Sequence, residues 1–193
     1  MSHPGLRADS GDTPFVPTQY PGQSCVLALG SNLGDRLDIL QGAVRAVASI
    51  PELTVVAASP VYETVPVGGP AQPDYLNAVL LARTTLSPRD LLGRLHEVEA
   101  AFDRVREVRW GPRTLDIDII TYEGVASDDP ELTLPHPRAH ERSFVLVPWH
   151  DVDPEAVLPG YGPVSGLIRG LPAEPGAEAR GGVRRAKEGL SVP

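Results

Sequence analysis

The sequence contains little cysteine and few aromatic residues, and it has no long apolar run. The single cysteine, Cys25, excludes an internal disulfide, and its position in the apolar run SCVLALG favours a buried structural thiol. No run approaches the roughly 20 apolar residues that span a bilayer. The N-terminal segment MSHPGLRADSGDTP lacks the apolar core of a signal peptide. We therefore expect a cytoplasmic protein.

Positive charge is also scarce. The formal net charge is −8, which disfavours non-specific binding to nucleic acid or to an anionic membrane. All of the 17 basic residues except Lys187 are arginines, and four of them, Arg104, Arg106, Arg109 and Arg113, fall within ten positions. An acidic protein with one arginine-dense segment is typical of a protein with one local anion site.

The chain is long enough for one domain of about 150 residues with tails. Residues 1–23 and 172–193 are rich in proline, glycine and small polar residues without periodicity, and they predict flexible N-terminal and C-terminal tails. The patterned region 24–171 between them is predicted to be the single domain.

The patterned region alternates between strand and helix signals. Apolar and β-branched runs predict strands at 24–30, 53–64, 74–84 and 114–123, and helical spacing of apolar residues predicts helices at 37–50 and 88–102. The resulting order, β-α-β-β-α-β, predicts an α+β fold with a ferredoxin-like core, in which two helices pack on one face of an antiparallel sheet. C-terminal additions are expected as a hairpin within 124–136, a short helix near 137–142 and a last helix around 164–171.

The stretch RWGPRTLDIDII at 109–120 contains two carboxylates within an apolar run. Because side chains alternate along a strand, Asp116 and Asp118 share one face and Ile117 points to the other. Two such carboxylates can converge on small divalent cations, and the arginines just before them suit phosphate, so the pattern indicates a nucleotide triphosphate site. The alternative is an exposed sheet face with solvated aspartates and an arginine loop that pairs with nearby acidic residues.

Two further motifs have both a functional and a structural interpretation. GSNLGD at 30–35 could cradle a phosphate at a helix start, but it lacks the Lys-Ser/Thr of a P-loop, and a plain turn with capping by Asn32 or Asp35 is the alternative. In QPDYLNAV, Tyr75 and Asn77 share a strand face and could bind a flat heterocycle, or they could simply pack in the core.

RWGPRTLDIDII resembles the signature of the 6-hydroxymethyl-7,8-dihydropterin pyrophosphokinase family. The resemblance continues in LALGSNLGDR, VYETVPVGGPAQPDYLNAV, LHEVEAAFDRVREVRWGPR and LTLPHPRAHERSFVLVP, and it covers about residues 24–170. It implies a ferredoxin-like fold and magnesium-dependent transfer of pyrophosphate from ATP to the hydroxymethyl group of the pterin, with release of AMP, in folate biosynthesis. The expected partners are therefore ATP and 6-hydroxymethyl-7,8-dihydropterin, with no nucleic acid or membrane, and we expect a monomer.

The resemblance also implies roles for individual positions. Asp116 and Asp118 would hold two magnesium ions, and the catalytic set would add Arg104, Arg106 and Arg113. ATP would be bound by Glu99, Arg106, Arg109, Trp110, Arg113, Ile119, Thr133, His136 and Arg142. The pterin would be bound by Thr64, Pro66, Val67, Tyr75, Asn77, Trp110 and Phe144.

Two other functions remain open on the residues alone. A metal-dependent nucleotidyl or glycosyl transferase could use the same Asp-x-Asp pair. A ferredoxin-like RNA-binding module could use the arginine loop and Trp110, although the net charge argues against it.

Overall fold

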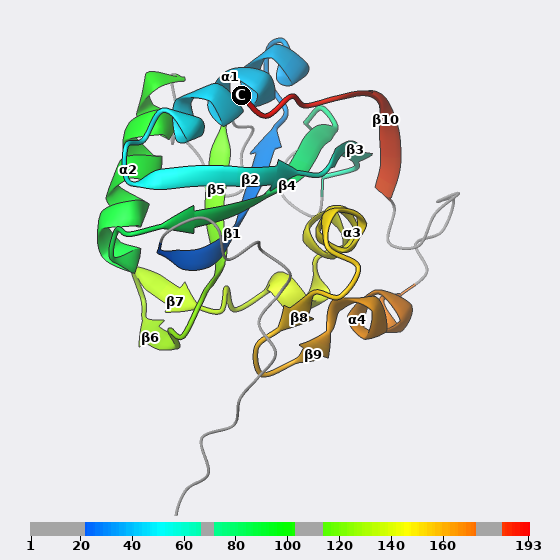
Figure 1. The fold of residues 1–193 in the computed structure, drawn as a ribbon. Coiled ribbons are helices and arrows are strands. Elements are labelled where there is room, and N and C mark those ends of the chain that lie inside the picture. The colour runs from blue at the N-terminus through cyan, green and yellow to red at the C-terminus, as the bar shows by residue number, and fades with distance from the viewer. Residues whose placement is uncertain (1–21, 67–71, 103–113, 173–182) are drawn as a thin grey trace, which may run out of the picture.

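A six-stranded antiparallel sheet forms the centre of the protein (Figure 1). The computed structural model describes residues 22–66, 72–102, 114–172 and 183–193, and every structural statement below refers to these residues. The strands of the sheet are β1 (Gln23–Ser31), β2 (Leu53–Ala58), β3 (Pro60–Thr64), β4 (Tyr75–Thr84), β5 (Asp116–Tyr122) and β10 (Val183–Gly189). Two small hairpins consist of β6 (Ser127–Asp129) with β7 (Leu132–Leu134), and β8 (Val157–Leu158) with β9 (Gly162–Pro163).

Helices cover both faces of the sheet (Figure 1). The helices are α1 (Arg36–Ala48), α2 (Pro88–Ala101), α3 (Ser143–Val152) and α4 (Val164–Gly170), with a 3-10 turn at Ala139–Glu141. The helices α1 and α2 share one hydrophobic core with the sheet, and α3 and α4 share a second core on the opposite face. Among the described residues no helix is long and apolar enough to cross a membrane. The expected antiparallel sheet with packed helices is confirmed.

The strand β1 lies between β4 and β5 and is antiparallel to both. On its other side, β4 pairs with β2 and β3 in succession. The sequence predicted one strand over 53–64, but this strand is interrupted at Ser59. The Ser59 backbone N–H donates to the Val79 carbonyl, and the Ser59 hydroxyl accepts from the Val79 N–H. Pro60 then starts β3 without a donor N–H, so the side chain of Ser59 replaces part of the ladder.

The start of α2 follows its sequence signal. The Ser87 side chain accepts a hydrogen bond from the Asp90 N–H, and Pro88 occupies the first turn, as the sequence predicted. The start of α1 decides between the two capping candidates, because the Asp35 side chain accepts from the Asp38 N–H at 3.2 Å. Asn32 therefore has another role in the turn.

The helix α3 was not predicted, since its sequence SFVLVPWHDV contains Pro148 and its apolar run does not distinguish a helix from a strand. Val145, Leu146 and Trp149 are each fully buried against the sheet. Burial of such side chains contributes about 1.5–3 kcal/mol each, which is enough to outweigh the poor helix propensity of the segment.

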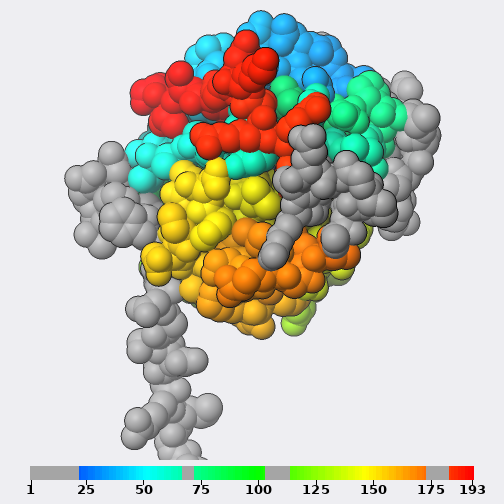
Figure 2. Space-filling model, turned by 90° about the vertical axis from the view of Figure 1, so that its right-hand side faces the viewer, coloured from blue at the N-terminus to red at the C-terminus, as the bar shows by residue number. Residues whose placement is uncertain are grey.

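The prediction of a flexible C-terminal tail over 172–193 is wrong for residues 183–193. Val183 is buried, and β10 pairs antiparallel with β3 at the edge of the sheet. The chain then passes next to α1, where Leu190 and Val192 pack against the core and Gln41 exchanges two hydrogen bonds with Ser191 (Figure 1). Figure 2 shows this last segment lying across the surface between α1 and α3. The charged sequence VRRAKEG did not indicate a strand, because an edge strand needs apolar residues only on the side that faces the core.

Candidate functional site

The two aspartates of β5 lie on the same face of the sheet. Asp116 is registered with Gly30 of β1 and Asp118 with Ala28, so both carboxylates face the side of the sheet on which α3 lies. Ile117, together with Leu115 and Ile119, points the other way into the core under α1 and α2. The alternation that the sequence predicted for LDIDI is therefore what the strand adopts.

Two basic side chains meet Asp118 from the segment that follows β7. Arg142 Nη1 lies 3.3 Å from Asp118 Oδ2, and His136 Nε2 lies 3.8 Å from the same oxygen. His136 is fixed through its backbone, because its N–H donates to the Ile120 carbonyl at 2.8 Å. Arg142 is the residue immediately before α3, so the start of the unpredicted helix places this guanidinium at the acidic pair.

The charge state of His136 follows from its surroundings. Burial, and after it the nearby Arg142 guanidinium, lowers the pKa of His136 to about 4. The imidazole is therefore neutral near pH 7, and its 3.8 Å approach to Asp118 is not an ion pair at that pH. A neutral imidazole next to a guanidinium and a carboxylate can donate a hydrogen bond to an anionic ligand without adding charge.

A cavity of about 270 Å³ opens next to Asp118. Thr133 and His136, both expected at ATP, contribute to its wall, as does Ile119. The rest of the wall consists of Leu92, His96, Ile117, Pro130, Glu131, Leu132 and Pro137. Among these residues, Leu92 and His96 of α2 had no predicted role. Leu92 and His96 lie one turn apart on α2, and this spacing reads as an ordinary helix face, so no local signal could have marked them.

Glu99 has a different environment from that expected of an ATP-binding wall. Its side chain is only 1% exposed, and Oε1 accepts a 2.8 Å hydrogen bond from the Ile117 backbone N–H. The carboxylate therefore contacts the backbone of β5 through this hydrogen bond.

A second group of predicted residues lies at the same end of the sheet. Asn77 Nδ2 donates to Thr64 Oγ1 at 2.7 Å, and both side chains are buried. Tyr75, two positions before Asn77 on β4, faces the same way. A side chain at Gly30 would approach Asn77 Oδ1 to 3.1 Å and Tyr75 Cδ1 to 3.8 Å.

Gly30 connects the two groups. It is registered with Asn77 on one side and with Asp116 on the other, so the amide and the carboxylate flank a position without a side chain. Any larger residue would fill the surface between them. The sheet therefore presents an open face between an acidic pair and a hydroxyl-amide-aromatic group.

Other expected residues are placed less directly. Phe144 lies in the first turn of α3, and its ring centroid is 5.5 Å from the Arg142 guanidinium carbon. Pro66 lies two residues after the end of β3. Val67, Arg104, Arg106, Arg109, Trp110 and Arg113 lie outside the described residues.

Fold and site together define a protein of helices packed on an antiparallel sheet, in which Asp116, Asp118, the neutral His136 and Arg142 lie together at one end of the sheet. The family model described as 7,8-dihydro-6-hydroxymethylpterin-pyrophosphokinase matches residues 26–154, which is more than half of the chain. The chain belongs to this family of enzymes, as its sequence motifs predicted.

Several curated relatives are named 2-amino-4-hydroxy-6-hydroxymethyldihydropteridine pyrophosphokinase. The Methylorubrum extorquens protein is 47% identical over 134 residues, which cover 69% of this chain and 85% of the relative. The Mycobacterium tuberculosis protein is 48% identical over 159 residues, with 76% of this chain and 82% of the relative covered. The Pseudomonas aeruginosa protein is 40% identical over 152 residues, with 79% and 94% covered.

Two similar solved structures are longer chains that are named HPPK-DHPS. A triple mutant of the Plasmodium falciparum HPPK-DHPS superposes with a TM-score of 0.63 at 15% identity, over 80% of this chain and 44% of that chain. An HPPK-DHPS in complex with substrates superposes with a TM-score of 0.59 at 12% identity, over 78% and 43%. The chain thus spans less than half of these structures, and at such identities the likeness concerns the fold.

Proposed function

We propose that this chain transfers the pyrophosphoryl group of ATP to the hydroxymethyl oxygen of 6-hydroxymethyl-7,8-dihydropterin and releases AMP. The observation that carries the proposal is the register at Gly30, which sets Asn77 and Asp116 on either side of one open surface. A heterocycle held at Asn77 and a phosphate chain held at Asp116 would meet there. We also propose a ferredoxin-like topology for the core, and the strand order β5, β1, β4 and β2/β3 supports this proposal.

The pterin is assigned to Thr64, Tyr75 and Asn77. Because Asn77 Nδ2 is committed to Thr64, its Oδ1 remains to accept from the amino and ring N–H donors of a pterin edge. The Tyr75 ring can stack on the heterocycle. Phe144 is the proposed second ring, on the opposite face of the heterocycle, and Pro66 and Val67 are proposed to contact its edge.

The nucleotide is assigned to the cavity between α2, β5 and the β6–β7 hairpin. Thr133, His136 and Ile119 line this cavity together with Asp118, one of the two aspartates of β5. In the proposed arrangement, neutral His136 donates a hydrogen bond to a phosphate oxygen and Arg142 neutralises phosphate charge. Arg104, Arg106, Arg109, Trp110 and Arg113 are proposed to complete the phosphate and pterin contacts, with Arg104, Arg106 and Arg113 acting in catalysis.

Asp116 and Asp118 fit magnesium. Hard oxygen ligands on one strand face, with the side chain of Asp118 39% exposed, suit an ion that keeps few protein ligands and takes the others from phosphate and water. We propose two ions, which would neutralise the triphosphate.

In the reaction, the pterin oxygen forms a bond to the β-phosphorus, the bond to the α-phosphate oxygen breaks, AMP leaves, and the hydroxyl proton goes to solvent. Charge neutralisation and positioning carry such a transfer.

The test is AMP release from ATP by the purified protein. We expect AMP only when magnesium and the hydroxymethyl pterin are both present, and a chelator should abolish the reaction. Asp118→Asn should lower the rate at least about 100-fold while the circular dichroism spectrum is retained. Glu52→Gln, at an exposed carboxylate before β2, is the matched control and should be fully active. Release of pyrophosphate instead of AMP, or an active Asp118→Asn variant, would overturn the proposal.

A further inference from the structure

The turn between β1 and α1 holds the segment that leads into β4. Asn32 in this turn is 1% exposed, and its Nδ2 donates to Gln72 Oε1 at 3.0 Å and to the Pro73 carbonyl at 3.1 Å. Since Asp35 caps α1, this amide is not needed at the helix start. The Asn32 amide instead contacts a side chain 40 positions later in the chain.

The contact continues to the proposed pterin-stacking residue. The Tyr75 hydroxyl donates to Gln72 Oε1 at 3.3 Å. One amide oxygen therefore accepts hydrogen bonds from both Asn32 and Tyr75. The hydroxyl end of the Tyr75 ring is thus linked through Gln72 to a buried side chain of the β1–α1 turn.

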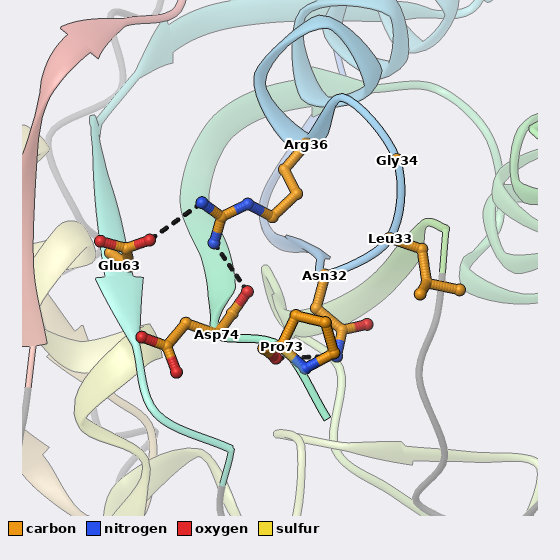
Figure 3. Close-up of a pocket in the computed structure, with 7 residues that line it drawn as sticks. All are labelled: Asn32, Leu33, Gly34, Arg36, Glu63, Pro73 and Asp74. Atoms are coloured by element: carbon orange, nitrogen blue, oxygen red, sulfur yellow. Dashed lines mark hydrogen bonds and ion pairs between the residues drawn. The ribbon is translucent and has the colours of Figure 1, made fainter. Parts of the chain in front are cut away.

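A second contact holds the same segment from α1. Figure 3 shows the Arg36 guanidinium between Glu63 of β3 and the backbone of Asp74. Arg36 Nη1 donates to the Asp74 carbonyl at 2.7 Å, and Nη2 lies 2.9 Å from Glu63 Oε1. The hydrogen bond from Arg184, and after it that from Arg36, lowers the pKa of Glu63 despite partial burial. The backbone that precedes Tyr75 is thus held at two points.

We propose that Asn32 is a positioning residue for the pterin: through Gln72 it fixes the Tyr75 ring in the orientation that the heterocycle stacks on. This inference rests on the proposed function. A Tyr75 ring that is already held in place loses less rotational freedom when the ligand binds. The gain in affinity therefore applies only to the ligand that stacks on this ring. ATP binds elsewhere on the sheet and should be insensitive to Asn32.

The first experiment compares KM values in Asn32→Leu, which keeps the volume and removes the donor. We expect the pterin KM to rise about tenfold and the ATP KM to stay within about twofold, with kcat changed less than the pterin KM. Gln72→Met removes the shared acceptor at a half-buried position, and it should change the two KM values in the same way. This variant also tests the inference if Asn32→Leu does not fold. The matched control is Thr84→Val at the other end of β4, where a buried hydroxyl donates to the Glu52 carbonyl. It should lower thermal stability without a change in pterin KM.

The second experiment follows Tyr75 without any substrate. With 3-fluorotyrosine in place of the five tyrosines, the Tyr75 fluorine resonance can be assigned from its loss in Tyr75→Phe. We expect Asn32→Leu and Gln72→Met to shift this resonance and Thr84→Val to leave it unchanged. An unchanged resonance in both variants, or a pterin KM raised equally in Thr84→Val, would overturn the inference. Failure of the proposed function would appear separately, as a wild-type protein that releases no AMP.

Discussion

Glu99 Oε1 accepts a 2.8 Å hydrogen bond from the backbone N–H of Ile117, the residue between the two aspartates of β5. The carboxylate comes from α2, on the face of the sheet opposite to the carboxylates of Asp116 and Asp118. One buried acidic side chain thus holds the strand from the opposite face, at the residue between its two half-buried aspartates.

This relationship makes Glu99 a stability residue as well as a candidate for the site. Glu99→Ala should lower the free energy of unfolding by about 2–4 kcal/mol, because it leaves the buried Ile117 N–H without this acceptor and opens a cavity. Glu99→Gln keeps an oxygen at the same place and should cost less. Urea denaturation of the two variants measures the difference, and equal losses would show that the hydrogen bond to Ile117 is not what Glu99 contributes.

Arg142 and Arg138 form a matched pair four residues apart. Arg142 lies 3.3 Å from Asp118 at the cavity, whereas Arg138 pairs with Glu141 on the exposed surface at 2.6 Å. Arg142→Ala should weaken ATP binding by roughly 10- to 100-fold, because a charge-assisted contact to phosphate is worth about 1.5–3 kcal/mol. Arg138→Ala should bind ATP like the wild type. Titration calorimetry with a non-hydrolysable ATP analogue compares the two, and equal affinities would remove Arg142 from the site.

The last strand should contribute to stability through burial rather than through its charges. Val183 is 3% exposed, so Val183→Ala should lower the free energy of unfolding by about 1–3 kcal/mol. Arg184→Ala should lower the free energy of unfolding by less than about 1 kcal/mol, because the ion pair of Arg184 with Glu63 lies at the surface. Thermal unfolding of both variants shows which substitution lowers stability more. If Arg184→Ala is the more damaging, the edge strand is held by its ion pairs instead.

The thiol of Cys25 should report on unfolding. Burial raises the pKa of this thiol to about 12 from an ordinary value near 9. At pH 8 a disulfide reagent should therefore react slowly with the native protein and rapidly in denaturant. Between pH 9 and 12 the thiol ionises only in the unfolded chain, so unfolding releases a proton and the free energy of unfolding falls as the pH rises. Cys25→Ala should remove that part of the pH dependence, and a fast native reaction at pH 8 would contradict the burial.

Local periodicity was sufficient for the parts of the site that lie on one element. The alternation in LDIDII placed Asp116 and Asp118 together, and the Ser87 and Pro88 signal located the start of α2. The same reasoning failed for α3, because the apolar content of SFVLVPWHDV does not distinguish a buried strand from a buried helix. It also failed for β10, where tertiary pairing with β3 outweighs a charged sequence of low strand propensity.

By itself, the sequence determined the family, the types of side chain at the site and the strand face on which each one lies, because these depend on motifs and on the two-residue repeat of a strand. Only the tertiary structure decided that Asn77 and Asp116 flank Gly30, that His96 of α2 joins Thr133 in one cavity, and that Asn32 reaches Gln72. These contacts join residues that are distant in the chain, and their register is set by how whole elements pack. No local pattern carries that information.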